Sequence, residues 1–84
     1  MITKEDKEII KDIIGHRYAP IIQDELNESK EFNKDGEPYS TGQITNVMNG
    51  VKHSVIEAAI YRVVEFRLAE EKKRQLLLNK MQNA

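Results

Sequence analysis

The sequence contains no cysteine, and only 6% of its 84 residues are aromatic. Without cysteine, disulfides and thiolate metal sites are excluded, and the chain is compatible with a reducing compartment. No apolar run approaches the roughly 20 residues needed to span a bilayer. The opening M-I-T-K-E-D-K-E is charged where a signal peptide would be apolar. These absences predict a soluble cytoplasmic protein.

What is present indicates one small helical domain. A chain of this length has little room for a second core. The hydrophobic fraction of 39% and the charged fraction of 32% suit a compact bundle with a solvated outer face. Apolar residues recur at helical spacing in four segments, which predicts an all-α, small four-helix bundle with an extended C-terminal helix.

The first two helices carry recognisable boundary signals. Thr3 and Asp6 match a capping box, and Gly15 stands where a helix would end. The second helix is expected to begin near Ala19, with Pro20 in its first turn. The residues expected to face the core are Ile9, Ile10, Ile13 and Ile14 in the first helix and Tyr18, Ile21, Ile22 and Leu26 in the second.

The stretch Y39-S-T-G-Q-I-T-N-V-M-N-G50 reads as a short helix with a cap at each end. Ser40 and Gln43 form a second capping box, and Gly50 follows the last helical turn. The side chains expected to face inward are Ile44, Val47, Met48 and Val51. Those expected to point away are Gly42, Thr45, Asn46 and Asn49, with Gln43 at the margin.

Charge is unevenly distributed along the chain. Residues 1–37 carry six Lys/Arg and ten Asp/Glu, a net of −4, whereas residues 38–84 carry seven and four, a net of +3. From Pro38 to Ile56 there is no acidic residue. A surface that meets a phosphate backbone is expected to look like this window, although a gap of this size also occurs by chance in ordinary domains.

Residues 40–50 resemble the recognition helix of the lambda-repressor-like helix-turn-helix proteins, which include phage repressors, Cro proteins and Xre-type regulators. The resemblance rests on the Ser-Thr opening, on Ile44 and Val47 as buried positions, and on the closing Asn49-Gly50. It extends over residues 18–68 and implies a central helix-turn-helix, whose second helix lies in the major groove. Proteins of this family usually bind a pseudo-palindromic duplex as dimers.

The resemblance also implies roles for individual residues. It implies that four residues read bases, namely Thr41, Gly42, Gln43 and Asn46. It implies that three residues contact phosphates, namely Ser40, Asn49 and Lys52. Thr45 is added to the base-reading residues, because a threonine side chain can hydrogen-bond to a base or pack against a thymine methyl group. Each of several residues also has a purely structural alternative: capping for Gln43 and Asn49, a favourable position near the helix dipole for Lys52, and packing for Tyr39.

The spacing between the two motif helices departs from the family. From Leu26 to Ile44 there are 18 positions (44 − 26), several more than the family usually has. The extra residues include N33-K-D-G-E-P-Y39, a strong turn sequence. Either the second helix is longer and a loop bulges out, or the two helices are not in the family's geometry. The loop could add phosphate contacts through Lys34 and Tyr39, or it could hold the recognition helix off the groove.

The C-terminal end forms a separate region. We predict a helix-turn-helix domain over residues 1–69 and a helical extension over residues 70–84. The apolar residues of the extension, Leu76, Leu77, Leu78 and Met81, would be exposed on an isolated monomer. Arg67, Glu70 and Arg74 interrupt the apolar seam of a simple coiled coil. The extension could fold back, fray or cross to another subunit, and we favour a homodimer.

Taken together, the sequence predicts sequence-specific binding of double-stranded DNA by a dimeric transcriptional regulator of phage or mobile-element type. The alternative is a protein–protein interaction module that uses the acidic face of the first two helices or the apolar tail, with no DNA binding. His16 and His53 lie too far apart for a metal motif, and no phosphate loop or nucleophile–base pair is present. We therefore expect no enzyme activity, cofactor, metal, small-molecule ligand or membrane partner.

Overall fold

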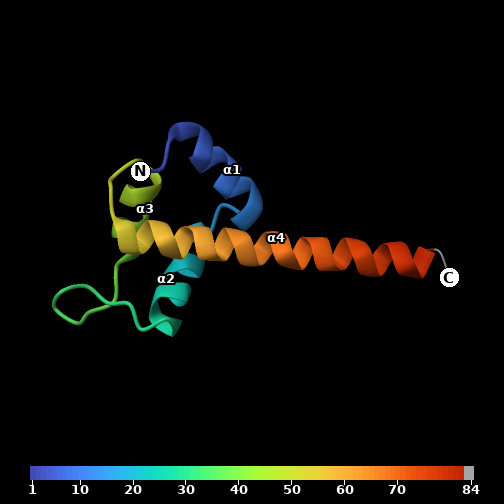
Figure 1. The fold of residues 1–84 in the computed structure, drawn as a ribbon. Helices are drawn as coiled ribbons and strands as arrows, with labels where there is room; N and C mark the ends of the chain where they lie inside the picture. The colour runs from blue at the N-terminus through green and yellow to red at the C-terminus, as the bar shows by residue number, and fades with distance from the viewer. Residues whose placement is uncertain (83–84) are drawn as a thin grey trace.

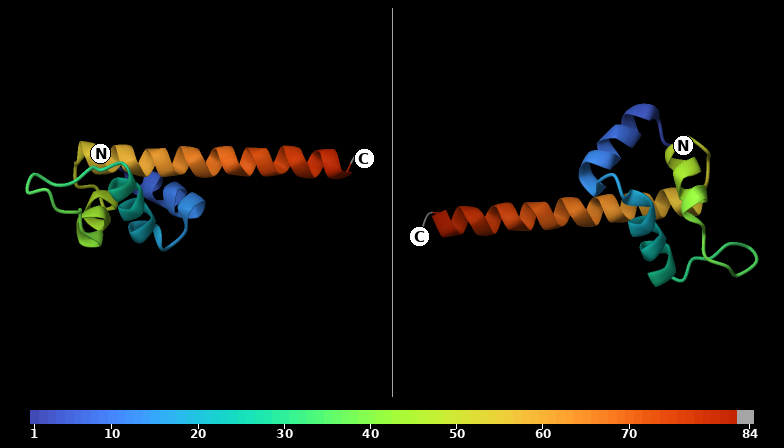
Figure 2. Two further views of the ribbon diagram at one scale, coloured as in Figure 1. Left: turned by 90° about the horizontal axis from the view of Figure 1, so that it is seen from below. Right: turned by 180° about the vertical axis from the view of Figure 1, so that it is seen from behind.

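The computed structural model describes residues 1–82, which form four α-helices and no strand. The helices are α1 (Lys4–Ile14), α2 (Tyr18–Glu28), α3 (Thr41–Met48) and α4 (Ser54–Gln82). The first three helices gather on one side of the N-terminal half of α4, and the rest of α4 projects away from them (Figure 1 and Figure 2). The predicted small all-α bundle is confirmed.

Helix α1 begins and ends at the predicted residues. The Asp6 amide donates to the Thr3 hydroxyl at 3.1 Å, and the Thr3 amide donates to the Asp6 carboxylate at 3.2 Å. Gly15 ends the helix with a φ of +107°. Ile10 and Ile14 are buried, but Ile9 is 58% exposed, so its predicted place in the core is wrong. Successive helical residues point about 100° apart, and only the Ile10 side of α1 faces the core.

Helix α2 begins at Tyr18, one residue before the predicted start, and ends in a Schellman motif. Lys30 has a φ of +56°, its amide donates to the Asn27 carbonyl, and the Glu31 amide donates to the Leu26 carbonyl at 2.9 Å. This turn satisfies carbonyl groups at the helix end and sends the chain into the α2–α3 loop, residues 29–40.

The core is formed between α4 and the other three helices. Its largest fully buried side chains are Ile22, Leu26, Ile44, Val47, Met48, Ile56 and Ile60. Burying a side chain of this size contributes roughly 1.5–3 kcal/mol. Each of α2, α3 and α4 supplies members of this set, so the orientation of α3 is fixed by the same core that stabilises the domain.

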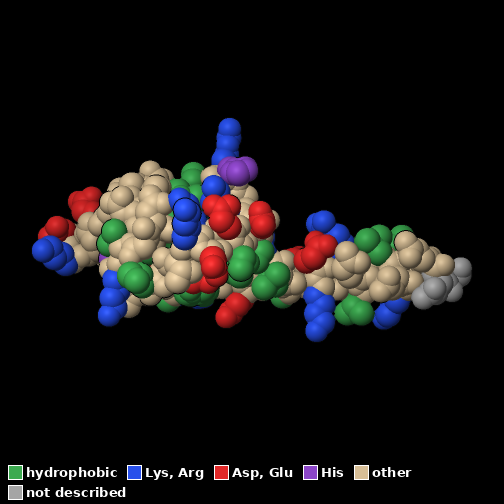
Figure 3. All heavy atoms as spheres, turned by 90° about the horizontal axis from the view of Figure 1, so that it is seen from above, with side chains coloured by type: hydrophobic (Ala, Val, Ile, Leu, Met, Phe, Trp, Pro, Cys, Tyr) green, Lys and Arg blue, Asp and Glu red, His purple; other side chains and the backbone are tan. Residues whose placement is uncertain are grey.

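Helix α4 runs unbroken from Ser54 to Gln82, which confirms the predicted extended C-terminal helix. Up to Val64 one side of the helix packs in or against the core, whereas every residue from 65 to 82 is exposed. We call residues 65–82 the α4 tail. The tail gives the molecule an extent of 55 Å and a radius of gyration of 15.1 Å, against roughly 12 Å expected for a compact chain of this length. Apolar, basic and acidic side chains are distributed along it (Figure 3).

The predicted domain boundary between residues 69 and 70 falls within this continuous helix. Burial changes five residues earlier, between Val64 and Glu65. The predicted extension also includes residues 83–84, which lie outside the described part of the chain. In residues 1–82, no helix has an apolar segment long enough to cross a membrane.

Candidate nucleic-acid interface

Helix α3 is held at both ends by short-range hydrogen bonds. At its start, the Gln43 amide donates to the Ser40 hydroxyl and the Ser40 amide donates to the Gln43 side-chain oxygen, both at 3.1 Å. At its end, Gly50 adopts a φ of +107°, and the Val51 amide donates to the Asn46 carbonyl at 3.0 Å. These caps satisfy backbone groups that would otherwise lack partners in a helix of only eight residues.

The buried side of α3 determines which side chains face solvent. Ile44, Val47 and Met48 are at most 1% exposed, as predicted. The predicted inward position of Val51 is wrong, because the turn at Gly50 redirects the chain and leaves Val51 exposed. The opposite side of the helix and its ends are exposed, and their residues are Thr41, Gly42, Gln43, Asn46 and Asn49. We call Thr41, Gly42, Gln43 and Asn46 the α3 polar face.

Thr45 lies at the edge of the α3 polar face. It is half-buried, and its hydroxyl donates to the Thr41 carbonyl at 2.9 Å. This internal bond occupies the hydroxyl proton that a base contact would use. The Thr45 methyl group is therefore the part of the side chain better suited to a contact.

The two amide side chains of the α3 polar face differ in their availability. The Gln43 oxygen is engaged by the Ser40 amide, so bidentate pairing with adenine would disturb the cap. Within residues 1–82, the Asn46 side chain has no hydrogen-bond partner. Asn46 can therefore offer both its donor and its acceptor without cost to the helix.

The residues predicted to contact phosphate differ in their exposure to solvent. Ser40, Lys34 and Lys52 are exposed, but Tyr39 is only 7% exposed. The Tyr39 ring packs edge-on against His53, with the ring centroids 5.1 Å apart. Because the phenol ring belongs to the core, we correct its predicted role from phosphate contact to packing.

Two lysines that the sequence reasoning missed lie beside the C-terminal end of α3. The Lys7 ammonium donates to the side-chain oxygen of Asn49, which is exposed at the C-cap position. Lys4 and Lys7 line a shallow pocket together with Met48 and Asn49. The charges were visible in the sequence, but 42 positions separate Lys7 from Asn49, and no local pattern connects them.

The α2–α3 loop accounts for the long spacing between the two motif helices. Helix α2 is not lengthened, and the loop bulges out beyond the bundle (Figure 1). The Asn33 side-chain oxygen accepts from the amides of Asp35 and Glu37, at 2.9 and 3.0 Å, which closes the turn. A cleft between this turn and Gln43 is lined by both Lys34 and Asp35. The loop therefore brings one positive and one negative charge beside the α3 polar face.

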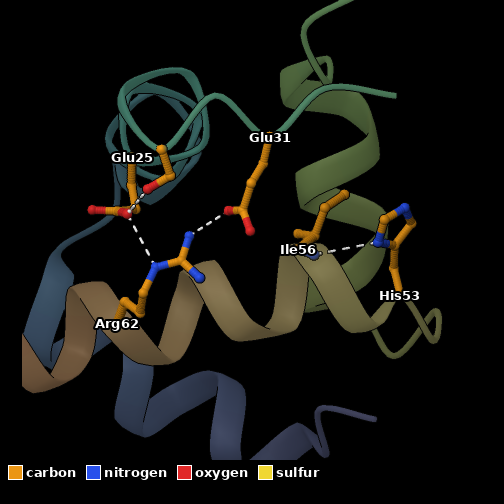
Figure 4. A network of polar contacts seen from close by, with 6 residues as sticks. Glu25, Glu31, His53, Ile56 and Arg62 are labelled. Carbon is orange, nitrogen blue, oxygen red and sulfur yellow. Dashed lines mark hydrogen bonds and ion pairs between the residues drawn. The ribbon is translucent and has the colours of Figure 1, made fainter. Parts of the chain in front are cut away.

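Arg62 of α4 anchors the start of the loop (Figure 4). Its Nε donates to the Glu25 carboxylate at 3.1 Å, and its Nη2 donates to the Glu31 carboxylate. The Ser29 hydroxyl donates to the same Glu25 carboxylate at 2.7 Å. The hydrogen bond from Ser29, followed by that from Arg62, lowers the pKa of Glu25 below its usual value near 4.5. This network ties α2 and the loop to α4.

His53 and the backbone around it hold the other end of the site (Figure 4). The His53 Nδ1 accepts from the Ile56 amide at 3.3 Å and caps α4. The His53 amide in turn donates to the Glu57 carboxylate at 2.9 Å. The segment from Gly50 to His53 is thereby fixed between two helices, with Lys52 directed to solvent.

The described residues contain no group of three or more His, Asp or Glu side chains placed to hold a metal ion. What the site offers is a short helix with a polar, acid-free outer side and lysines near both of its ends. No protein-family model, curated protein or solved structure matches the chain.

Proposed function

We propose that the protein binds double-stranded DNA in a sequence-specific manner, with α3 in the major groove. The observation that carries the proposal is the α3 polar face, which is exposed opposite a fully buried side. The segment from Pro38 to Ile56 that contains it has no acidic residue. The resemblance of residues 40–50 to a lambda-repressor-like recognition helix supports the same assignment and suggests a dimeric transcriptional regulator of phage or mobile-element type.

The side chains of the α3 polar face suit base edges. An asparagine or glutamine amide can pair bidentately with adenine, and Asn46 is free to do so. Thr41 can bond to a base or a phosphate oxygen. Gly42 lets the backbone approach closely, since the space where its side chain would lie holds only the Ser40 hydroxyl, at 3.7 Å.

Phosphate contact is assigned to Ser40 and to the lysines around α3. These lysines are Lys4, Lys7, Lys34 and Lys52. Each neutralised phosphate contributes about −0.9 to the slope of log affinity against log salt, so four contacts give roughly −3 to −4. Non-specific binding is therefore expected to be weak, and specificity to come from the α3 polar face.

The first experiment selects bound sequences from a random duplex pool at low salt. The selected duplex and a scrambled duplex are then titrated by fluorescence anisotropy. An enriched motif that binds much more tightly than the scramble supports the proposal. If nothing is enriched at any salt concentration, α3 is a capped structural helix, and the alternative of a protein–protein interaction module takes precedence.

A charge change at Asn46 then tests whether α3 makes the contact. Asn46→Asp keeps the shape of the side chain but places a carboxylate against the DNA. We expect affinity to fall by roughly fivefold to more than a hundredfold, since one lost base contact costs about 1–3 kcal/mol. Asn79→Asp makes the same chemical change on the α4 tail, far from α3. Equal losses in the two variants would show a general charge effect and would argue against α3 as the reading element.

Gly42→Ala is expected to stabilise the fold and to weaken DNA binding. Alanine is a better helix former than glycine, and the added methyl group meets no close atom, so stability should rise by about 0.5 kcal/mol. The same methyl group would separate the backbone from the DNA and weaken binding. A variant that is more stable and binds DNA as well as the wild type would contradict close approach at Gly42.

A further inference from the structure

The α4 tail carries a large apolar surface with no partner in the described part of the chain. Phe66, Leu68, Leu76, Leu77 and Met81 are each more than half exposed, between 52% and 66%. The tail lacks the tertiary packing from which most of the stability of helices in proteins comes. Exposed apolar surface of this kind marks a site of association.

The charged and apolar residues of the tail are arranged in blocks. An apolar block is followed by an acidic block, a basic block and a second apolar block. The blocks are Phe66 with Leu68, then Glu70 with Glu71, then Lys72 to Arg74, and finally Leu76 to Leu78 with Met81. Read backwards, this order places acidic residues opposite basic ones and apolar residues opposite apolar ones. The tail is therefore complementary to a reversed copy of itself.

One side of the tail has the alternating four- and three-residue spacing of a two-helix seam. Its residues are Val63, Arg67, Glu70, Arg74, Leu77 and Met81. In a parallel, in-register pair each of these residues would face its own counterpart. Glu70 would then meet Glu70, and Arg74 would meet Arg74, which is destabilising at a desolvated seam.

Reversing one of the two helices removes these conflicts. The facing pairs on the seam are then Glu70 with Arg74, Arg67 with Leu77 and Val63 with Met81. Arg67 can cover a leucine with its aliphatic stem while its guanidinium group stays in water. Glu70 and Arg74, the two charged residues at the centre of the seam, each gain an opposite charge, and both ends of the seam become apolar contacts.

The root of the tail offers a place for the end of the second helix. Ile21 and Phe66 line a groove between α2 and α4, together with Asp24. The reversed pairing brings Met81 of the second copy to this groove, with Lys80 beside it. The groove thus provides an apolar surface for the methionine and a carboxylate for the lysine.

We propose that two copies of this chain associate through their α4 tails, paired antiparallel about a two-fold axis near Lys72. Such a pair is symmetric and closed, so it stops at the dimer. Ser54 lies 18 residues from the axis (72 − 54), or roughly 27 Å of helix, so the two Ser54 residues lie roughly 54 Å apart. The two bundles then stand at opposite ends of the paired tails, farther apart than the roughly 34–36 Å between half-sites one DNA turn apart. This arrangement stands whether or not the protein binds DNA.

The test is sedimentation equilibrium of the full chain without DNA, combined with charge reversal at the centre of the tail. The wild type should be a concentration-dependent dimer. The double variant Glu70→Arg/Glu71→Lys places like charges opposite one another in the antiparallel pair, and its dissociation constant should rise by at least about tenfold. The quadruple variant, which adds Lys73→Glu/Arg74→Glu, restores both the net charge and the opposite-charge pair of residues 70 and 74, and it should return the dissociation constant to within about threefold of the wild type.

Parallel pairing needs a separate test. The double variant replaces two negative charges by two positive charges in each chain and would weaken a parallel pair too, so the orientation is read from disulfide cross-linking. Leu77→Cys alone should not cross-link in the antiparallel pair, because the two copies of residue 77 lie roughly 15 Å apart along the helices, whereas in a parallel pair they face one another. Cross-linking through Leu77→Cys alone, or a wild type that stays monomeric at millimolar concentration, would overturn the proposal. All four charge-reversed positions are exposed, so the thermal unfolding of the bundle should be unchanged and serves as the folding control.

Discussion

The two halves of α4 belong to one continuous helix but have opposite surroundings. Residues 54–64 include Ile56, Ala59, Ile60 and Val63, all buried against the other three helices. In residues 65–82 every side chain is exposed. The helix is thus stabilised by tertiary packing in its first half and, in the monomer, by local interactions alone in its second half.

This difference separates stability from association. Changes in the first half should lower the free energy of unfolding of the bundle, because they remove contacts that the native state alone contains. Changes in the tail should leave that free energy nearly unchanged in dilute solution and should appear only in measurements of self-association. Three pairs of substitutions, each with one member in the bundle and the other in the tail, test this difference.

The largest contrast is expected between Ile60→Ala and Leu77→Ala. Ile60 is 0% exposed, and its truncation should lower the free energy of unfolding by about 3 kcal/mol through lost burial and a residual cavity. Leu77 is exposed, and its truncation should change that free energy by less than about 0.5 kcal/mol. Urea unfolding followed by circular dichroism, at concentrations where the chain is monomeric, measures both. Comparable losses would mean that the tail packs on the bundle in solution.

The sequence was a good guide to features that depend on near neighbours. Capping boxes at Thr3 and Ser40 were predicted because their partners lie three residues away, and both are present. The buried side of α3 followed from helical periodicity. The exposed face of α3 therefore also followed, because a helix that buries one side must present the other.

The failures came from contacts between distant residues. Arg62 bonds to carboxylates 37 and 31 positions away, and Lys7 bonds to Asn49 across 42 positions. Neither pairing has a signature in the sequence, because long flexible side chains can reach many partners on neighbouring helices. Tyr39 was misassigned for a related reason: its burial depends on where the loop returns to the bundle, which turn residues alone do not determine.

A second, smaller contrast is expected between Arg62→Met and Arg74→Met. Arg62 holds two carboxylates from the bundle, so its loss should lower the free energy of unfolding by about 1 kcal/mol after allowance for solvent screening. Arg74 lies 3.9 Å from Glu71 with both side chains largely exposed, and its replacement should have no measurable effect. Urea unfolding at pH 7 measures the difference.

The effect of Arg62→Met should also depend on pH. The pKa of Glu25 is lowered in the folded protein by Ser29 and then by Arg62. A carboxylate of this kind contributes stability above its unfolded pKa, near 4.5, and loses that contribution as the pH falls through its lower folded pKa. The gap between wild type and variant should therefore be largest near neutral pH and shrink below pH 4.5. A gap that widens with acid would contradict the assigned network.

The smallest contrast is expected between two short-range hydrogen bonds, one at α3 and one in the tail. Ser40→Ala removes the N-cap of an eight-residue helix that supplies core residues, and it should cost about 1 kcal/mol. Gln75→Ala removes a bond from the Gln75 amide to the Glu71 carboxylate within the tail, and it should cost no more than a few tenths of a kcal/mol. Thermal unfolding of the two variants compares the losses.

Ser40→Asp separates the two roles assigned to Ser40, which are capping α3 and contacting a DNA phosphate. Aspartate caps a helix about as well as serine does, so the stability lost in Ser40→Ala should be largely retained in this variant. Its carboxylate would nevertheless face the DNA backbone, so affinity for a selected duplex should fall even though α3 remains folded. If Ser40→Asp binds DNA as tightly as the wild type, then Ser40 serves only the cap, and the phosphate contacts must come from the lysines alone.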